Sequence, residues 1–136
     1  MKIEDFTMPY YDEVLSLWKR VGLSIGFSDK KAEVQKMLER NPGLFLIGKI
    51  NDRVIAVVEG GYDGRRGYVH HLAVDPEFQK KGYGSKIMLE LTQRFRQYNV
   101  YKIHLFIEKD RKKVVSFYKK LGWKKRKDLI MMSLIP

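Results

Sequence analysis

Residues 79–84, Gln-Lys-Lys-Gly-Tyr-Gly, combine a flexible turn with two basic side chains, a combination suited to binding an anion. They join an apolar run at residues 72–74 to a segment with helical spacing of apolar residues, which we expect to begin near Gly84. The first turn of a helix presents N–H groups without intrahelical acceptors, and the aligned peptide dipoles add partial positive charge there. Two glycines let a bulky anion approach the main chain, while Lys80 and Lys81 supply formal positive charge. The sequence therefore predicts a phosphate cradle at this turn.

Two familiar phosphate-binding loops do not match this spacing. A nucleoside triphosphate loop requires Lys-Ser or Lys-Thr after its second glycine, and neither pair follows Gly84. A dinucleotide loop requires a third glycine, and Ile87 stands at that position. What remains is Gln/Arg-x-x-Gly-x-Gly between a strand and a helix, which resembles the GNAT superfamily of N-acetyltransferases. In that family the loop binds the pyrophosphate of acetyl-coenzyme A.

A second motif strengthens the resemblance. Residues 117–123, Phe-Tyr-Lys-Lys-Leu-Gly-Trp, are similar to the Phe-Tyr-x-x-Leu-Gly-Phe segment near the GNAT C-terminus, and two motifs in the right order are more specific than either alone. The resemblance implies an acetyl-CoA-dependent N-acetyltransferase in which the amine attacks the thioester directly and Tyr118 protonates the leaving thiolate. It also implies acetyl-CoA contacts on the strand, the turn and the last helix, at Leu72, Ala73, Val74, Gln79, Lys80, Lys81, Gly82, Tyr83, Gly84, Ser85, Arg111, Val114 and Phe117.

Two of these positions depart from the family pattern. Arg111 and Val114 stand where GNAT proteins often carry asparagine and alanine. Arginine can donate to a pantetheine carbonyl but cannot accept a hydrogen bond. This leaves open whether Arg111 faces the pantetheine arm, a phosphate or an acidic substrate.

Acetyl transfer to an alkylamine requires a base, because an amine with a pKa of about 10.4 is mostly protonated at neutral pH. Glu59 lies inside an apolar run, where burial would raise the pKa of a carboxyl toward a useful value, although it could also be an outward-facing strand residue. His70 is the other candidate, since imidazole titrates in the useful range and some amine acetyltransferases of this family carry a histidine there. Strand alternation would put residues 68, 70, 72 and 74 on one face and His71 on the other. We expect no metal site at His70, His71 and His104, because the side chains of adjacent strand residues diverge and no thiolate or acidic ligand accompanies these histidines.

Composition limits the class of protein. The chain has 136 residues, 44% of them hydrophobic and 32% charged, which is typical of one globular domain spanning residues 1–136. It has no cysteine, which excludes a thiol nucleophile and a disulfide framework. No apolar run approaches bilayer length, and the acids near Met1 do not fit a signal peptide, so we expect a cytoplasmic protein.

The net charge of +11 favours an anionic partner. Residues 109–127 contain ten basic residues and one acid, a net charge of +9, with Tyr118 and Trp123 interleaved. One alternative is therefore a nucleic-acid-binding module, and another is an acyl-CoA-binding module without turnover. We expect instead an amine-bearing small molecule or protein as acceptor, with neither nucleic acid nor membrane as partner, and leave a homodimer open.

The elements that must position these residues follow from periodicity. Apolar patterns predict strands over residues 2–6, 44–50, 53–60, 68–74, 102–107 and 123–134, and helices over 10–21, 29–40, 84–98 and 111–121. Asn51-Asp52 fits a two-residue hairpin turn, and Ser28 or Asp29 fits a helix cap. Strand–helix–strand around residues 79–84 implies a parallel pair. The predicted fold class is single-domain α/β, with a mixed, mostly antiparallel sheet, a central parallel strand pair and helices on both faces, as in GNAT proteins.

The loop at residues 60–67, followed by a strand and by Asp-Pro-Glu-Phe at residues 75–78, resembles the YpeA-type branch of small stand-alone acetyltransferases. That branch implies no particular substrate. Specificity in such folds depends on loops and on the first two helices, where no motif is readable. The acceptor could therefore be a protein N-terminus, a lysine, a polyamine, an aminoglycoside or a small metabolite amine.

Overall fold

A computed structural model describes all 136 residues, which form two compact units, Met1–Phe106 and Ile107–Pro136. The first unit contains every strand and the helices α1, α2 and α3, and the second contains α4. No helix combines the length and apolar character needed to cross a bilayer. One domain over residues 1–136 stays a prediction.

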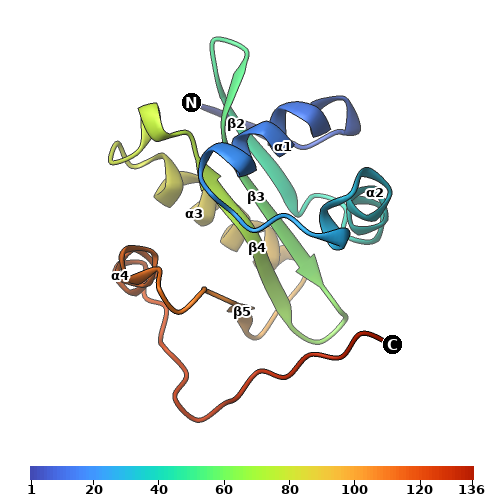
Figure 1. The fold of residues 1–136 in the computed structure, drawn as a ribbon, viewed down its shortest axis with the longest axis vertical. Coiled ribbons are helices and arrows are strands. Elements are labelled where there is room, and N and C mark those ends of the chain that lie inside the picture. The colour runs from blue at the N-terminus through green and yellow to red at the C-terminus, as the bar shows by residue number, and fades with distance from the viewer. The chain divides into compact units, whose positions relative to one another are not determined.

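The first unit is built on a five-stranded sheet in the order β1-β2-β3-β4-β5 (Figure 1). Every neighbouring pair is antiparallel except β4 and β5, which are parallel and form one edge of this sheet. The predicted α/β class with a mixed, mostly antiparallel sheet is confirmed, but the prediction that the parallel pair is central is wrong, because β5 is an edge strand. The strand bounds are β1 Lys2–Asp5, β2 Phe45–Ile50, β3 Arg53–Tyr62, β4 Gly67–Val74 and β5 Ile103–Leu105.

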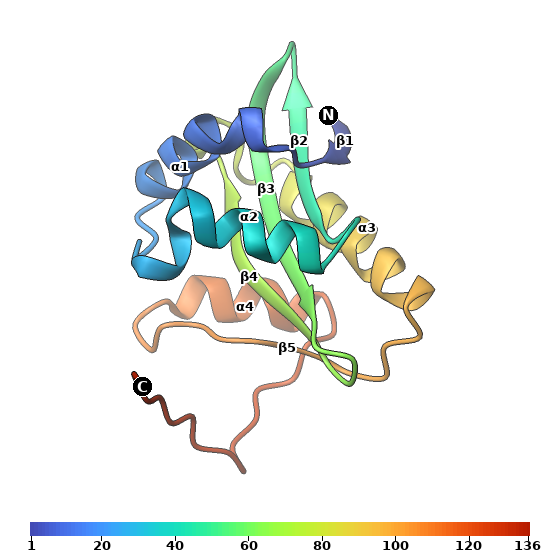
Figure 2. The same cartoon turned by 90° about the vertical axis from the view of Figure 1, so that its right-hand side faces the viewer.

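Helices cover both faces of this sheet. Figure 2 shows α1 (Tyr11–Arg20) and α2 (Lys31–Arg40) on one face and α3 (Tyr83–Gln97) on the other. Burial of apolar side chains drives this arrangement. The fully buried Trp18 of α1 lies in one cluster with apolar residues of the sheet face beneath it, namely Phe45, Ile47, Val54, Val57 and Ala73. We call this face, covered by α1 and α2, the front face. The short 3₁₀ turns are Met8–Tyr10, Phe27–Asp29 (η2) and Pro76–Phe78 (η3).

The hairpin turn predicted at Asn51-Asp52 is confirmed. These residues join β2 to β3 with φ angles of +50° and +63°. Asparagine and aspartate tolerate this left-handed region better than most residues, and two successive positive φ angles match the twist of a two-residue hairpin.

The cap predicted at Ser28 or Asp29 is wrong. Helix α2 begins at Lys31, with Lys30 as its N-cap and no side-chain hydrogen bond at the cap. The Asp29 carboxylate instead accepts a hydrogen bond from the Gly26 backbone N–H and lies beside His71 of β4. Asp29 therefore caps the 3₁₀ turn Phe27–Asp29 and contacts a distant strand, but it does not cap α2.

Strand β4 contains a bulge opposite β3. Val57 pairs with Ala73 and Glu59 pairs with His70, so β4 has one more residue than β3 between these two pairs. His71 lies in this extra stretch with φ of +47°, which is uncommon for a residue other than glycine.

The bulge changes which side chains share a face. Because alternation has a period of two, one extra residue moves the following side chains to opposite faces. Ala73 belongs to the core cluster under α1, and His70 faces the same side through its pairing with Glu59. The prediction that residues 68, 70, 72 and 74 share one face is therefore wrong beyond His70.

The second unit contains α4, Lys112–Lys120, close to the predicted helix over 111–121. The strand predicted over residues 123–134 is wrong, because residues 123–136 form neither helix nor strand. Its apolar side chains beyond Trp123 are exposed, with Ile130, Met132 and Leu134 almost fully so. A strand needs a neighbour for its N–H and C=O groups, and apolar alternation alone does not supply one.

Candidate active site

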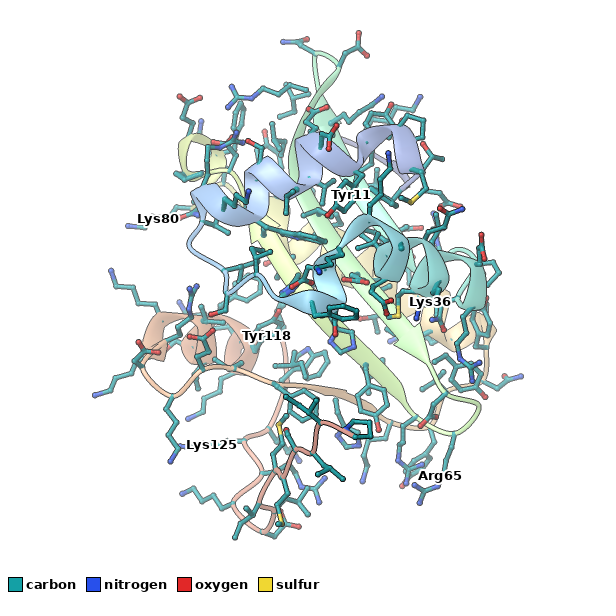
Figure 3. All side chains as sticks on the ribbon, turned by 45° about the vertical axis from the view of Figure 1, so that its right-hand side comes forward. Tyr11, Lys36, Arg65, Lys80, Tyr118 and Lys125 are labelled. Carbon is teal, nitrogen blue, oxygen red and sulfur yellow. The ribbon has the colours of Figure 1, made fainter.

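The turn before α3 has the backbone of an anion cradle. Helix α3 begins at Tyr83, one residue before the predicted start, and Gly82 caps it in the left-handed region with φ of +86°. Lys80 also has a positive φ, of +62°. Lys80 is exposed and projects outward from the turn (Figure 3). The first N–H groups of α3 lack intrahelical acceptors by helix geometry, so this turn is suited to a phosphate group.

The two ends of the turn are tied to the sheet. The Gln79 side-chain amide donates to the Val74 carbonyl oxygen over 2.9 Å. Gly84, the second residue of α3, is buried. The conformation of residues 79–84 is therefore set by β4 on one side and by the packing of α3 on the other.

Asp75 anchors the chain just before this turn. Its side chain, 1% exposed, accepts hydrogen bonds from the guanidinium groups of Arg20 (2.6 Å) and Arg53 (2.8 Å), and from the Glu77 backbone N–H (3.0 Å). Burial opposes ionisation of Asp75, but these three donors outweigh it and hold the pKa of the carboxyl below its ordinary value. Asp75 thus links α1, β3 and η3 at the entrance to the cradle.

The C-terminal part of β4, residues 72–74, has no neighbouring strand on the side of β5. The parallel pairing ends at Val69, which pairs with Leu105, so the expected contact residues Leu72, Ala73 and Val74 have no strand partner there. Main-chain groups at such a strand edge can bind an extended ligand as an added strand, and of these the Val74 carbonyl oxygen already accepts a bond from the Gln79 side chain. This edge leads directly into the cradle at residues 79–84.

Glu59 is a buried carboxyl on β3. Its side chain is directed to the front face, opposite His70, and is 7% exposed. Burial raises the pKa of this carboxyl to about 7, and the negative charge of Asp29 adds to the effect. The expectation of a buried position is confirmed, and the alternative of a solvent-facing strand residue is excluded.

The two histidines of β4 both lie on the front face, because the bulge cancels the alternation between them. Burial lowers the pKa of His70 below its ordinary value, the neighbouring His71 adds to this, and Asp29 opposes it. The His71 ring contacts Trp18 of α1, with 5.0 Å between ring centres, and its Nε2 lies 2.7 Å from Oδ1 of Asp29. The prediction that His71 points to the opposite face is wrong.

Asp29 belongs to this site, although the sequence pattern indicates only a helix cap at this position. It lies 42 positions before His71. No local pattern pairs these two residues, since their contact depends on the path of the segment between α1 and α2. Asp29, Glu59, His70 and His71 form no group of metal-ligating side chains suited to holding an ion.

In the second unit, α4 presents several expected residues at helical spacing. Val114 and Tyr118 are four residues apart, which puts them on one side of the helix, and Arg111 is its N-cap residue. The Tyr118 ring meets Phe117 and Trp123 edge-on, at centroid distances of 5.1 and 5.6 Å. Burial raises the pKa of the Tyr118 hydroxyl above its ordinary value, so this group stays protonated at neutral pH.

Comparisons with known proteins agree with this geometry. The sequence model of the Acetyltransferase (GNAT) family matches residues 6–123. A curated acetyltransferase of Pectobacterium atrosepticum is 31% identical over 123 residues, which cover 90% of this chain and 87% of that protein.

Solved structures share the fold. An aminoglycoside 6′-N-acetyltransferase from Acinetobacter haemolyticus superposes with a TM-score of 0.81 at 15% identity, covering 100% of this chain and 99% of that one. The PaiA N-acetyltransferase of Thermoplasma acidophilum, solved with coenzyme A, gives a TM-score of 0.79 at 17% identity, covering 90% of this chain and 89% of that one. None of these comparisons names the YpeA-type branch, which stays a prediction.

Proposed function

Because the chain belongs to the GNAT family of acetyltransferases, with acetyl-CoA as co-substrate, we propose that it acetylates a primary amine by direct attack in a ternary complex. The observation that carries this proposal is Glu59, a buried carboxyl with a pKa of about 7 on the front face of the sheet. A base with this pKa is half ionised at neutral pH, and it can take a proton from an amine that must lose one before it attacks.

The proposed reaction balances without any further reactant. Glu59 accepts a proton from the ammonium form of the acceptor, and the neutral nitrogen attacks the thioester carbonyl carbon. The tetrahedral intermediate collapses as the C–S bond breaks, and the Tyr118 hydroxyl gives its proton to the leaving thiolate. The Tyr118 phenolate then takes the second proton from the acylated nitrogen, and Glu59 releases its proton to solvent. The raised pKa of the Tyr118 hydroxyl supports its role as the acid, because a protonated phenol is available at neutral pH.

His70 is the second candidate for the base. It faces Glu59 across the strand pair, and its lowered pKa keeps the imidazole neutral and able to accept a proton near neutral pH. We assign the first proton transfer to Glu59, because a proton neutralises its buried carboxylate, whereas a proton would add a charge to the half-buried imidazole of His70. A relay from Glu59 through His70 would use the same two side chains.

The acetyl-CoA contacts are proposed along the features described above. Residues 79–85 would bind the pyrophosphate through backbone N–H groups, and the free edge at residues 72–74 would hydrogen-bond the pantetheine arm and polarise the thioester carbonyl. Arg111, Val114 and Phe117 of the second motif are the remaining proposed contacts. The basic segment at residues 109–127 would favour the approach of a polyphosphate ligand.

An acceptor screen tests the proposal. Purified protein is incubated with acetyl-CoA and a panel of aminoglycosides, polyamines, lysine-containing peptides and free peptide N-termini, and thiol release is followed with a chromogenic reagent. Because the chain has no cysteine, the reagent reports only coenzyme A. We expect release with at least one amine and an N-acetyl product by mass spectrometry. Binding of acetyl-CoA without transfer to any amine, or transfer only to hydroxyl groups, would overturn the proposal.

A further inference from the structure

Asp29 is a buried acid at the end of the segment that joins α1 to α2. It is 9% exposed, and its two carboxylate oxygens have different partners. Oδ2 accepts a hydrogen bond from the Gly26 backbone N–H over 2.9 Å, and Oδ1 lies 2.7 Å from Nε2 of His71. The Asp29 carbonyl oxygen accepts a third bond, from the Tyr11 hydroxyl, over 2.7 Å. One residue therefore connects its own loop, α1 and β4.

His71 is held in an unfavourable backbone conformation. Its φ of +47° lies in the left-handed region, which is unfavourable for a residue other than glycine. Such conformations persist where surrounding contacts determine them, and they cluster at functional sites. The contacts on His71 are the Asp29 carboxylate on one side and the Trp18 ring on the other.

The bulge containing His71 sets the orientation of the residues on both sides of it. Immediately before it, His70 faces Glu59, and immediately after it, residues 72–74 form the free strand edge. A β4 strand without the bulge would turn the side chains on one side of position 71 to the opposite face. Either His70, the second candidate base, or the strand edge at residues 72–74 would then be lost from the site.

We infer that Asp29 and His71 form a positioning pair, which holds the β4 bulge and the α1–α2 connection in the arrangement that acetyl transfer requires. This inference rests on the proposed function. Neither residue is given a chemical step, and both act through Glu59, His70 and the strand edge. The pair also attaches residues 26–29 to the sheet beside Glu59, which would fix one wall of the acceptor site.

The charged and titratable groups around this pair are few. Glu59 and His70 share the front face with it, from β3 and β4, and Tyr11 approaches from α1. Asp29 adds negative charge near Glu59. Loss of that charge should therefore make Glu59 easier to ionise and move the acidic limb of the rate profile to lower pH.

The test compares His71→Ala, which leaves Asp29 buried without its partner, with His71→Gln, whose amide can still donate to Asp29. Glu33→Gln is the matched control, since it removes an ion pair within α2 between Glu33 and the exposed Lys36. We expect His71→Ala to lower kcat and raise the acceptor KM, each by about tenfold, because misplacement by about 1 Å can cost up to a hundredfold. His71→Gln should recover most of this loss, and the control should match the wild type. The Kd for coenzyme A, measured by calorimetry, should weaken in His71→Ala, because the pair holds the strand edge at residues 72–74 that is proposed to bind the pantetheine arm, and should match the wild type in Glu33→Gln.

A further variant, Asp29→Asn, and a further measurement, amide hydrogen exchange, test the inference separately from the proposed function. Asp29→Asn should shift the acidic limb of the kcat/KM profile to lower pH, an effect that mere destabilisation would not produce. Amide hydrogen exchange needs no substrate, and in His71→Ala it should speed up at residues 26–30 and 69–72 but not in the β2–β3 hairpin. Unchanged exchange at both segments would overturn the positioning pair even if the enzyme acetylates amines. Unchanged kcat and KM in His71→Ala would also overturn it, whereas a wild-type protein inert toward every amine would overturn the proposed function alone.

Discussion

Glu59 of β3 and His70 of β4 are register partners on the front face of the sheet, one residue before a bulge that keeps His71 on that same face. Burial acts on the two groups in opposite directions, because each is pushed toward its neutral form. Near neutral pH the pair therefore combines a partly protonated carboxyl with a neutral imidazole. An arrangement of this kind can exchange protons with little change in net charge.

The role of Glu59 as a base predicts a specific loss in Glu59→Gln. The variant keeps the shape of the side chain but cannot accept a proton, so kcat should fall by about 10²–10⁴-fold. In the wild type, kcat should rise with pH through about 7, since only the ionised carboxyl is active. Steady-state rates across the neutral range, on both sides of that pKa, check both points. A variant with wild-type kcat and the same pH profile would shift the assignment to His70.

The same carboxyl predicts a pH-dependent change in stability. The pKa of Glu59 rises from an ordinary value of 4.5 to about 7 on folding, so folding favours the protonated form. Its contribution is complete below pH 4.5 and is lost as the pH rises through about 7, a difference of roughly 3 kcal/mol. Urea unfolding should therefore show Glu59→Gln gaining stability relative to the wild type as the pH rises through this window. Parallel stability curves for the two proteins would contradict the raised pKa.

Tyr118→Phe separates catalysis from binding. The substitution removes only the hydroxyl and keeps the ring that meets Phe117 and Trp123. We expect turnover to fall by about 10²-fold or more, as is typical for the loss of a general acid, with an unchanged Kd for coenzyme A. Calorimetry and the thiol-release assay on the same preparation measure the two quantities. Full activity in the phenylalanine variant would reject the proposed acid.

Gly82→Ala tests the cradle through the backbone. Gly82 has φ of +86°, and nothing lies within 4 Å of a Cβ placed there, so the substitution is opposed by conformation and not by a clash. The strain of about 1–2 kcal/mol should appear as a roughly five- to thirtyfold weaker Kd for acetyl-CoA, or as lower stability, because the turn must either hold the strained conformation or relax.

Gly26→Ala is the matched control for that experiment. A methyl group at Gly26 would also meet open space, but the φ of −133° at this position is accessible to any residue. Calorimetric titration of both variants should show a normal Kd for Gly26→Ala. Equal losses in the two variants would mean that the left-handed cap does not matter for binding.

The sequence pattern was sufficient to predict those features of the structure that depend on residues close together in the chain. The turn at Asn51-Asp52, the cradle at residues 79–84 and the strand–helix order around it were all predictable, because turn residues and apolar periodicity act over a few positions. Element bounds differ from the prediction by only one or two residues in most cases. The resemblance to the GNAT family, which combined two such local motifs, is confirmed.

What the sequence by itself determined was therefore the class of fold and the acetyltransferase family, whereas the burial of Glu59 was decided by the structure. Only the tertiary structure decided that β4 bulges at His71 and that both histidines share one face. It also decided that Asp29, expected to cap a helix, contacts His71 on a strand 42 residues away. It also left residues 123–136 without the predicted strand. The physical reason is common to these cases: strand pairing, bulges and buried charge pairs are contacts between distant segments, and one-dimensional periodicity carries no information about which segment supplies the partner.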